Sequence, residues 1–152
     1  MSEVTVVEAR AGVRGDTRSI RLRIPAKAEH IALARLALTG LAELCGMDEE
    51  TLADLKLALT EAVSNSIRHA YTEASGHVEI AYGLNETSIE IEVVDDGAGF
   101  DPDRPAALDG EELAEGGLGI AIIRSIVDEL EIHSQPGVRG SRLRFVKRLR
   151  DP

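Results

Sequence analysis

The strongest constraint on the fold is a long helical pattern in the middle of the chain, between Asp48 and Tyr71. Apolar residues recur there every three or four positions, as on the buried face of an amphipathic helix. Asp48 precedes the pattern as an N-cap, and two glutamates follow it in the first turn, where the helix dipole favours negative charge. The residues expected on the inner face are Leu52, Leu55, Leu59, Ala62 and Val63.

The segments around this helix do not alternate regularly between strand and helix. Residue alternation and turn signals predict six strands, and three- and four-residue spacing predicts two more helices. The expected strands are Val4–Arg10, Ser19–Ile24, His77–Gly83, Ser88–Val94, Glu131–Ser134 and Ser141–Leu149. The expected helices run from Ile31 to Cys45 and from Leu118 to about Leu130. This order predicts an α+β domain, one sheet with helices packed on one face, and we place no domain boundary within residues 1–152.

Composition and charge favour a folded, acidic protein. The chain has 27 Asp plus Glu against 17 Lys plus Arg, which gives a formal net charge of −10. Because affinity for nucleic acid rests largely on cationic contacts to phosphate, we expect no direct nucleic-acid binding, and a basic protein partner fits this charge better. The alternative that the charge serves only solubility stays open.

Several features favour a cytoplasmic location. Cys45 is the single cysteine, which suits a reducing compartment, and its apolar helical surroundings predict a buried structural thiol. The first residues lack the basic and apolar regions of a signal peptide, and no segment approaches the ~18 consecutive apolar residues of a membrane span. We therefore expect a cytoplasmic protein that does not contact the membrane.

The first cluster of chemically competent residues lies on the central helix. Glu61, Asn65 and His69 are spaced four residues apart and so form one polar stripe beside the apolar face. A carboxylate one turn from a carboxamide suits a site that accepts a proton and holds Mg²⁺, which prefers oxygen ligands. A solvated polar face is the alternative interpretation, and His69 receives no chemical role.

The second cluster follows the predicted strand that ends at Val94. Asp95 there can accept a hydrogen bond from an exocyclic amine such as that of adenine. Gly97 and Gly99 permit a positive φ and close approach of the backbone to a ligand. A glycine-rich turn is the alternative, whereas the ligand spacing of an EF-hand calcium loop is absent.

The third cluster, from Glu115 to Ile120, ends a long acidic loop and opens the last helix. Free amides and the dipole at a helix N-terminus attract phosphate, and glycines let the phosphate come close. The chain has no Walker A pattern, and this loop does not have the glycine pattern of a dinucleotide-binding fingerprint. A glycine hinge is the simpler alternative for this loop. Together, however, the three clusters supply a base-recognising carboxylate, a metal-holding amide and phosphate-binding glycines, with a long loop between the last two.

In this order the clusters resemble the N-box, G1-box, lid and G2-box of the GHKL (Bergerat) ATP-binding superfamily. The stretch from Asp54 to Tyr71 is similar to the N-box of RsbW/SpoIIAB-type anti-sigma serine kinases, and residues 24–27, 35–40 and 115–119 also match that type. The similarity extends from about Ile24 to Leu149. It implies a two-layer α/β sandwich with a mixed, mostly antiparallel sheet and three helices on one face.

The resemblance implies a role for each matching residue. Glu61 would be the general base that activates a serine hydroxyl on a partner protein, Asn65 would hold Mg²⁺, and Asp95 would bind the adenine amine. The other implied contacts are Gly97 and Gly99 at the adenine pocket, Gly117, Leu118 and Gly119 at the phosphates, Ser141 near the adenine, and Arg35 on a partner protein.

The resemblance also implies a function. A homodimer with bound ATP and Mg²⁺ would hold a sigma factor and would phosphorylate a serine of a STAS-type anti-anti-sigma antagonist. Two alternatives stay open: a non-catalytic ATP-gated binding module, and a paralogous switch kinase that acts on a phosphatase-activating pathway. A two-component sensor kinase is disfavoured, because the chain has no room for a helix pair that bears a phospho-accepting histidine.

One difference from the family pattern concerns the γ-phosphate. Some relatives carry a basic residue just before the G2 glycines, where this chain has Glu115 and Gly116. Arg104 is the only basic residue between Asp96 and Gly117.

Overall fold

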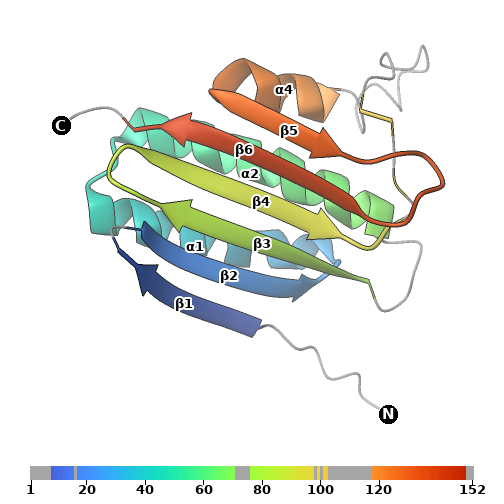
Figure 1. Ribbon diagram of the computed structural model, residues 1–152, viewed down its shortest axis with the longest axis horizontal. Helices are drawn as coiled ribbons and strands as arrows, with labels where there is room; N and C mark the ends of the chain where they lie inside the picture. Colours follow the sequence, from blue (N-terminus) through green and yellow to red (C-terminus); the bar gives the residue numbers. More distant parts are fainter. Residues whose placement is uncertain are drawn as a thin grey trace.

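The computed structural model describes residues 8–15, 17–70, 76–97, 99, 101–102 and 118–149 (Figure 1). Within these residues six strands form one sheet, in which every pairing is antiparallel. They are β1 (Glu8–Arg14), β2 (Thr17–Pro25), β3 (His77–Leu84), β4 (Ser88–Asp95), β5 (Glu129–His133) and β6 (Ser141–Arg148). Their order across the sheet is β1-β2-β3-β4-β6-β5.

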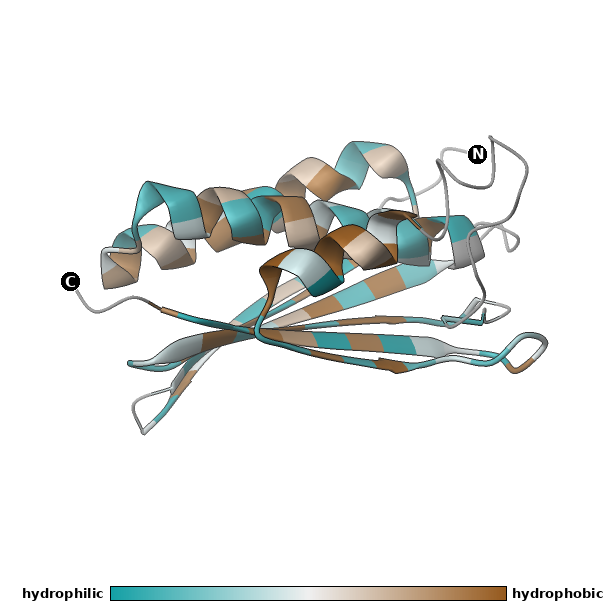
Figure 2. Cartoon of the chain, turned by 90° about the horizontal axis from the view of Figure 1, so that it is seen from above, coloured by the Kyte–Doolittle hydropathy of each residue, from teal (hydrophilic) through white to brown (hydrophobic). Residues whose placement is uncertain are grey.

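In the part of the chain that the structure describes, three helices cover one face of this sheet (Figure 2). They are α1 (Ile31–Cys45), α2 (Glu49–Ala70) and α4 (Leu118–Ile126), and a short 3₁₀ turn, η1 (Ala28–His30), leads into α1. The opposite face is solvated and carries ion pairs between β4 and β6, such as Arg142 to Glu92 at 2.8 Å. The predicted α+β class, with helices on one side of a single sheet, is confirmed.

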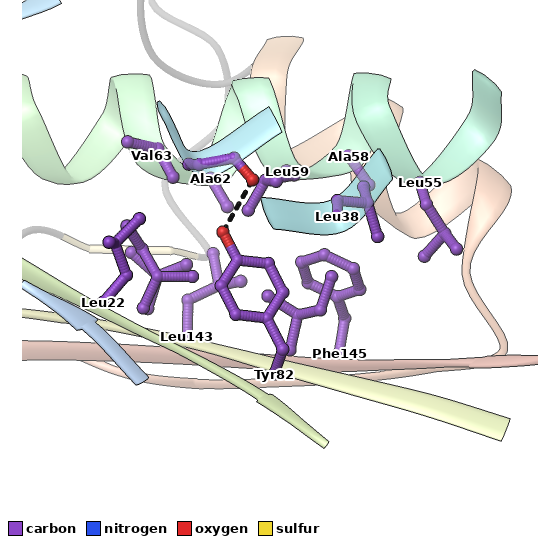
Figure 3. Packing of buried hydrophobic residues seen from close by; sticks show 14 of the residues in the cluster. Leu22, Leu38, Leu55, Ala58, Leu59, Ala62, Val63, Tyr82, Leu143 and Phe145 are labelled. Atoms are coloured by element: carbon purple, nitrogen blue, oxygen red, sulfur yellow. Dashed lines mark hydrogen bonds between the residues drawn. The ribbon is translucent and has the colours of Figure 1, made fainter. Parts of the chain in front are cut away.

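The core lies between the sheet and the inner face of α2 (Figure 3). Of the five residues predicted for that face, four are fully buried, and Leu52 is half-buried at its edge. Tyr82 of β3 crosses the core, and its hydroxyl donates a hydrogen bond of 2.7 Å to the carbonyl of Ala34 in α1. Burial raises the pKa of the Tyr82 phenol well above its ordinary value, so this hydroxyl stays protonated and keeps α1 attached to the sheet.

The helix and hairpin ends follow the predicted capping chemistry. Asp48 caps α2, because its Oδ2 accepts the Thr51 N–H at 3.3 Å. Gly46 ends α1 with a φ of 67°, the left-handed conformation that glycine adopts without strain. In the β3–β4 turn, Asn85 Oδ1 accepts the backbone N–H groups of Thr87 and Ser88.

Two predicted element ends were wrong by four residues. The first strand was placed at Val4–Arg10, but β1 continues to Arg14; all its residues are exposed, so burial imposes no alternation that would mark its end. The last helix was expected to reach Leu130, but it ends at Ile126, whose carbonyl accepts a hydrogen bond of 2.6 Å from Lys147 Nζ. The chain then joins β6 as β5, and Leu130 packs against the core from a strand.

The prediction for Cys45 was also wrong. The residue is exposed at the last position of α1, although its spacing from Leu41 and Ala42 puts it on the same helix face as these buried residues. Spacing fixes the face of a helix that a residue occupies, but not whether the core extends as far as the helix end.

Candidate functional site

The elements that carry the three sequence clusters meet at one end of the molecule. The end of β4, the C-terminal half of α2, the first turn of α4 and the start of β6 all lie at the right-hand end of the sheet in Figure 1. Antiparallel pairing of β4 with β6 places Asp95 opposite Ser141. The fold therefore gathers residues that are far apart in the sequence.

The polar stripe of α2 is partly removed from water. Asn65 is 4% exposed, and Glu61, one turn earlier, is half-buried. A carboxamide this deeply buried needs hydrogen-bond partners, so Asn65 is not part of a solvated helix face. The side chain of His69 lies outside the described residues.

Glu61 lies directly against the N-terminus of α4. A Cβ atom added at Gly119 would be 2.8 Å from Glu61 Oε2, which is closer than real Cβ contacts. Only glycine therefore fits between α4 and this carboxylate without displacing it. The first and third clusters thus meet, with a carboxylate beside the free amides of a helix N-terminus.

Asp95 is the buried acid of the second cluster. It is 2% exposed at the last position of β4, and its Oδ1 accepts the Gly97 N–H at 2.8 Å. Ser141, its neighbour across the sheet, is 6% exposed, and its Oγ lies 2.8 Å from Ser134 Oγ. A buried carboxylate beside a buried and a half-buried hydroxyl can recognise a group that offers hydrogen-bond donors.

The segment after Asp95 packs closely on the β5–β6 turn. Gly97 O accepts the Gly140 N–H at 2.8 Å. Gly99 has a φ of 79°, and a Cβ there would clash with the carbonyl oxygen of Gln135 and come within 2.5 Å of that of Val138. Sequence reasoning assigned Gly99 to ligand approach only; the structure adds a close backbone–backbone contact.

Sequence reasoning missed Ser134, whose hydroxyl is hydrogen-bonded to that of Ser141. A signal for it existed, since two serines flank a turn rich in glycine and proline, but strand register decides whether they meet. Of the other predicted residues, Leu118 is 52% exposed as the first residue of α4, and Arg35 is exposed on α1. Gly117, Glu115 and Arg104 lie outside the described residues.

The donor set fits a nucleotide whose phosphates contribute ligands to a cation. Among the described residues, no group of three or more His, Cys, Asp and Glu side chains could hold a metal ion. Mg²⁺ prefers oxygen ligands and usually keeps several waters, and the carboxamide oxygen of Asn65 is a ligand of that kind. Among the residues that the structure describes, no helix is long and apolar enough to cross a membrane.

The fold and the site define a nucleotide-binding kinase or ATPase domain. Residues 24–147 match the family model of the histidine kinase-like ATPase domain, which is most of the chain. The chain belongs to the histidine kinase-like ATPase family, and it therefore has an ATP-binding domain.

Curated relatives specify the enzyme class. Serine-protein kinase RsbW of Oceanobacillus iheyensis is 38% identical over 128 residues, which are 78% of this chain and 81% of that protein. Serine-protein kinase RsbW of Bacillus cereus strain AH820 is 34% identical over 137 residues, 85% of this chain and 86% of that protein. The chain is thus a protein serine/threonine kinase of the RsbW family.

Solved structures support the fold alone. The RsbU and RsbW domains of a Mycobacterium tuberculosis protein match with a TM-score of 0.62 at 23% identity, over 87% of this chain and 33% of that one. The histidine kinase domain of a blue-light activated kinase from Erythrobacter litoralis matches with a TM-score of 0.52 at 23% identity, over 91% of this chain and 66% of that one. This chain therefore spans a third of the first structure and 66% of the second.

Proposed function

We propose that this kinase is a cytoplasmic anti-sigma factor that uses Mg²⁺-bound ATP to phosphorylate a serine of a STAS-type anti-anti-sigma protein. The observation that carries the catalytic part is the contact between Glu61 and the N-terminus of α4 at Gly119. It puts a proton acceptor where a helix N-terminus favours phosphate. The relatives named serine-protein kinase RsbW support the choice of serine as acceptor.

Asp95 is proposed to select the base. Its carboxylate is buried at the end of β4 and is oriented by the Gly97 N–H. An acceptor fixed in this way favours the exocyclic amine of adenine over the C6 oxygen of guanine. Ser141 and Ser134 supply hydroxyls beside it. Gly97 and Gly99 are proposed to shape the adenine pocket, Gly99 through its close packing on the β5–β6 turn.

Asn65 and the first turn of α4 are proposed to hold the phosphate end. The Asn65 carboxamide oxygen would be a ligand to Mg²⁺, and the amides at Gly117, Leu118 and Gly119 would donate to phosphate oxygens. Bound ATP and Mg²⁺ supply the transferable γ-phosphoryl group and neutralise the charge on its oxygens.

Glu61 is proposed to move the proton. Its carboxylate accepts the proton of the substrate serine hydroxyl as the serine oxygen bonds to the γ-phosphorus, while the bond from that phosphorus to the β,γ-bridging oxygen breaks and ADP leaves. Gly119 leaves room for the carboxylate beside the N-terminus of α4, so the base is already in place before the transfer begins.

The partners are proposed from the family and from charge. A homodimer with bound ATP would hold a sigma factor away from RNA polymerase, and phosphorylation would stop the antagonist from binding. The ATP/ADP ratio and dephosphorylation would then set sigma release. The net charge of −10 suits a partner with a basic contact surface, and Arg35, exposed on α1, is the proposed contact residue of this chain.

A second candidate, a non-catalytic ATP-gated binding module, is favoured by one sequence feature. Glu115 and Gly116 stand where some relatives have a basic residue near the γ-phosphate. Without that charge the domain would bind ATP and a partner but transfer phosphate poorly.

The test compares Glu61→Gln with wild type in transfer of radiolabelled phosphate from ATP to a purified STAS-domain protein. Loss of the base is expected to lower the rate about 10²- to 10⁴-fold, with the ATP dissociation constant nearly unchanged. Glu49→Gln, which changes an exposed glutamate at the start of the same helix, is the control and should keep the wild-type rate.

Two results would contradict the kinase proposal. Near wild-type transfer by Glu61→Gln would remove Glu61 from the proton step. If the wild-type protein captures the STAS protein in an ATP-dependent way without any transfer of label, the non-catalytic module is the correct function.

A further inference from the structure

The face of the sheet opposite the helices, in front in Figure 1, carries many charged residues. Where β4 and β6 lie side by side, arginines are paired with glutamates. Arg142 Nη2 lies 2.8 Å from Glu92 Oε2, and Arg144 contacts both Glu90 and Glu131. These two arginines of β6 thus have acidic partners within the protein.

Two arginines of β1 and β2 on the same face are arranged differently. The strand register puts Arg10 directly opposite Arg21, and both are exposed. Leu22, the next residue of β2, is buried against the helices, so Arg21 points away from them. Within the part of the chain that the structure describes, neither arginine side chain makes an ion pair or a hydrogen bond. We call Arg10 and Arg21 the arginine pair.

The arginine pair lowers the stability of the protein alone, because like charges directly across two strands repel each other. Arg23, two residues further along β2, is compensated by Glu8 opposite it on β1 and by Glu79 on β3. The neighbour of Arg21 on β3 is Ala81, which carries no charge. Solubility does not require this repulsion, since the chain already has a net charge of −10. A contact with another molecule would explain it.

Small residues lie beside the arginine pair. The adjacent row across β1, β2 and β3 consists of Gly12, Ser19 and Gly83. A Cβ atom added at Gly12 would lie 3.3 Å from Ser19 Oγ. Glycine within a strand often marks a place where another backbone approaches closely. A polypeptide segment can therefore lie close to the sheet beside the two guanidinium groups.

We propose that the arginine pair is a docking surface for an acidic, extended segment of another protein, which lies against the outer face of β1 and β2. Carboxylates of this segment bind the guanidinium groups through charge-assisted, two-point hydrogen bonds, which arginine forms better than lysine. The local charge fits such a partner, because residues 8–25 hold five of the 17 Lys and Arg but only two of the 27 Asp and Glu. A bound carboxylate also offsets the repulsion between the two arginines.

The surroundings favour a peptide over a nucleic acid. On the same face, Glu79 of β3 and Glu92 of β4 follow the arginine pair across the sheet, where they would repel a broad phosphate backbone. A single extended segment meets only the strip formed by β1 and β2. The net charge of −10 acts in the same direction, since affinity for nucleic acid rests on many cationic contacts.

The first arm of the experiment titrates the full chain into a fluorescent peptide of alternating glutamate and serine, long enough to follow β1. We expect saturable binding that weakens with added salt, and no binding of the matching glutamine–serine peptide. Arg10→Glu and Arg21→Glu should each weaken binding roughly five- to thirtyfold. Arg142→Glu is the control, because it makes the same change of charge at a paired arginine of the same face. It should change the affinity less than about twofold.

A stability measurement separates docking from folding. Arg10→Glu puts unlike charges opposite each other, so the midpoint of urea unfolding should stay the same or rise while peptide binding falls. A lower midpoint would contradict the repulsion on which the proposal depends.

The second arm locates the peptide through amide chemical shifts of the isotope-labelled protein, without ATP or Mg²⁺. The largest changes are expected in β1 and β2 around Arg10 and Arg21. Neither residue belongs to the candidate nucleotide site, so this result does not depend on the proposed kinase function. Loss of phosphate transfer in the Glu61→Gln test would leave it unchanged.

The outcomes decide the proposal. Saturable binding that both reversals weaken and the control does not, with shifts in β1 and β2, supports it. Absence of saturable binding, equal weakening by Arg142→Glu, or shifts centred on another surface would overturn it. Tighter binding of a single-stranded oligothymidylate than of the glutamate peptide, lost in the same two variants, would assign the arginine pair to nucleic acid instead.

Discussion

At the scale of single residues, Gly119 is a position where a substitution is expected to lower kinase activity without lowering the stability of the fold. A Cβ there would be 2.8 Å from Glu61 Oε2, the end of a flexible side chain, so the carboxylate moves and the helix stays. The position of the Glu61 carboxylate thus depends on residue 119 having no side chain, at the contact between α2 and α4.

Gly119→Ala is therefore expected to keep or slightly raise the free energy of unfolding, since alanine favours a helix over glycine by about 1 kcal/mol. Displacement of Glu61 should lower the rate of phosphate transfer about a hundredfold. Gly40→Ala in α1, which has open space around its Cβ, is the control. It should raise stability by a similar amount and leave the rate unchanged; equal rates for both variants would contradict the role of this contact.

The placement of the candidate site residues on their helix or strand was predictable, because it follows from local sequence patterns. Four-residue spacing places Glu61 and Asn65 on one helix face, and a strand end places Asp95 before its glycines. Burial was not predictable from these patterns. Asn65 is 4% exposed because of the way α2 packs on the sheet, and the Ser134–Ser141 contact depends on how β6 pairs with its neighbours. Both arrangements involve distant parts of the chain.

At the scale of elements, the β5–β6 turn supports the loop after β4. Gly99 has a φ of 79° and no space for a Cβ between two backbone carbonyls, whereas Gly137 has a φ of 76° and open space. The two glycines have nearly the same φ but differ in the space around them.

Gly99→Ala is expected to lower the free energy of unfolding by about 3 kcal/mol or more, because the cost of a positive φ in alanine adds to the cost of the steric overlap. Gly137→Ala should lower it by about 1–2 kcal/mol, from the positive φ alone. Urea unfolding measures both. Equal losses would mean that the loop after β4 does not pack on this turn as described.

Element boundaries were less predictable than element types. The helix α4 and the strand β5 share one apolar pattern, and the break between them at Ile126 is fixed by tertiary contacts, such as the hydrogen bond from Lys147. β1 has no buried face, so its extent could not be read from alternation. In both cases the deciding interactions come from other strands.

At the scale of the whole molecule, the fold brings the residues proposed to bind adenine and those proposed to bind phosphate to one end of the domain. β4 and β6 carry Asp95 and Ser141, and α2 and α4 carry Glu61, Asn65 and Gly119. The α+β class was predictable from the order of elements, because helices that do not alternate with strands must share one face of a sheet. The central claim is that these parts form one pocket for an adenine nucleotide.

Calorimetric titration of ATP into the purified chain tests this claim most directly. With Mg²⁺ present we expect saturable binding, weaker binding after chelation of the metal, and little binding of GTP. Asp95→Asn should weaken ATP binding about ten- to a hundredfold, since it removes a charged acceptor from a buried site. Absence of saturable heat with ATP and Mg²⁺, or equal affinity of wild type and Asp95→Asn, would contradict the account.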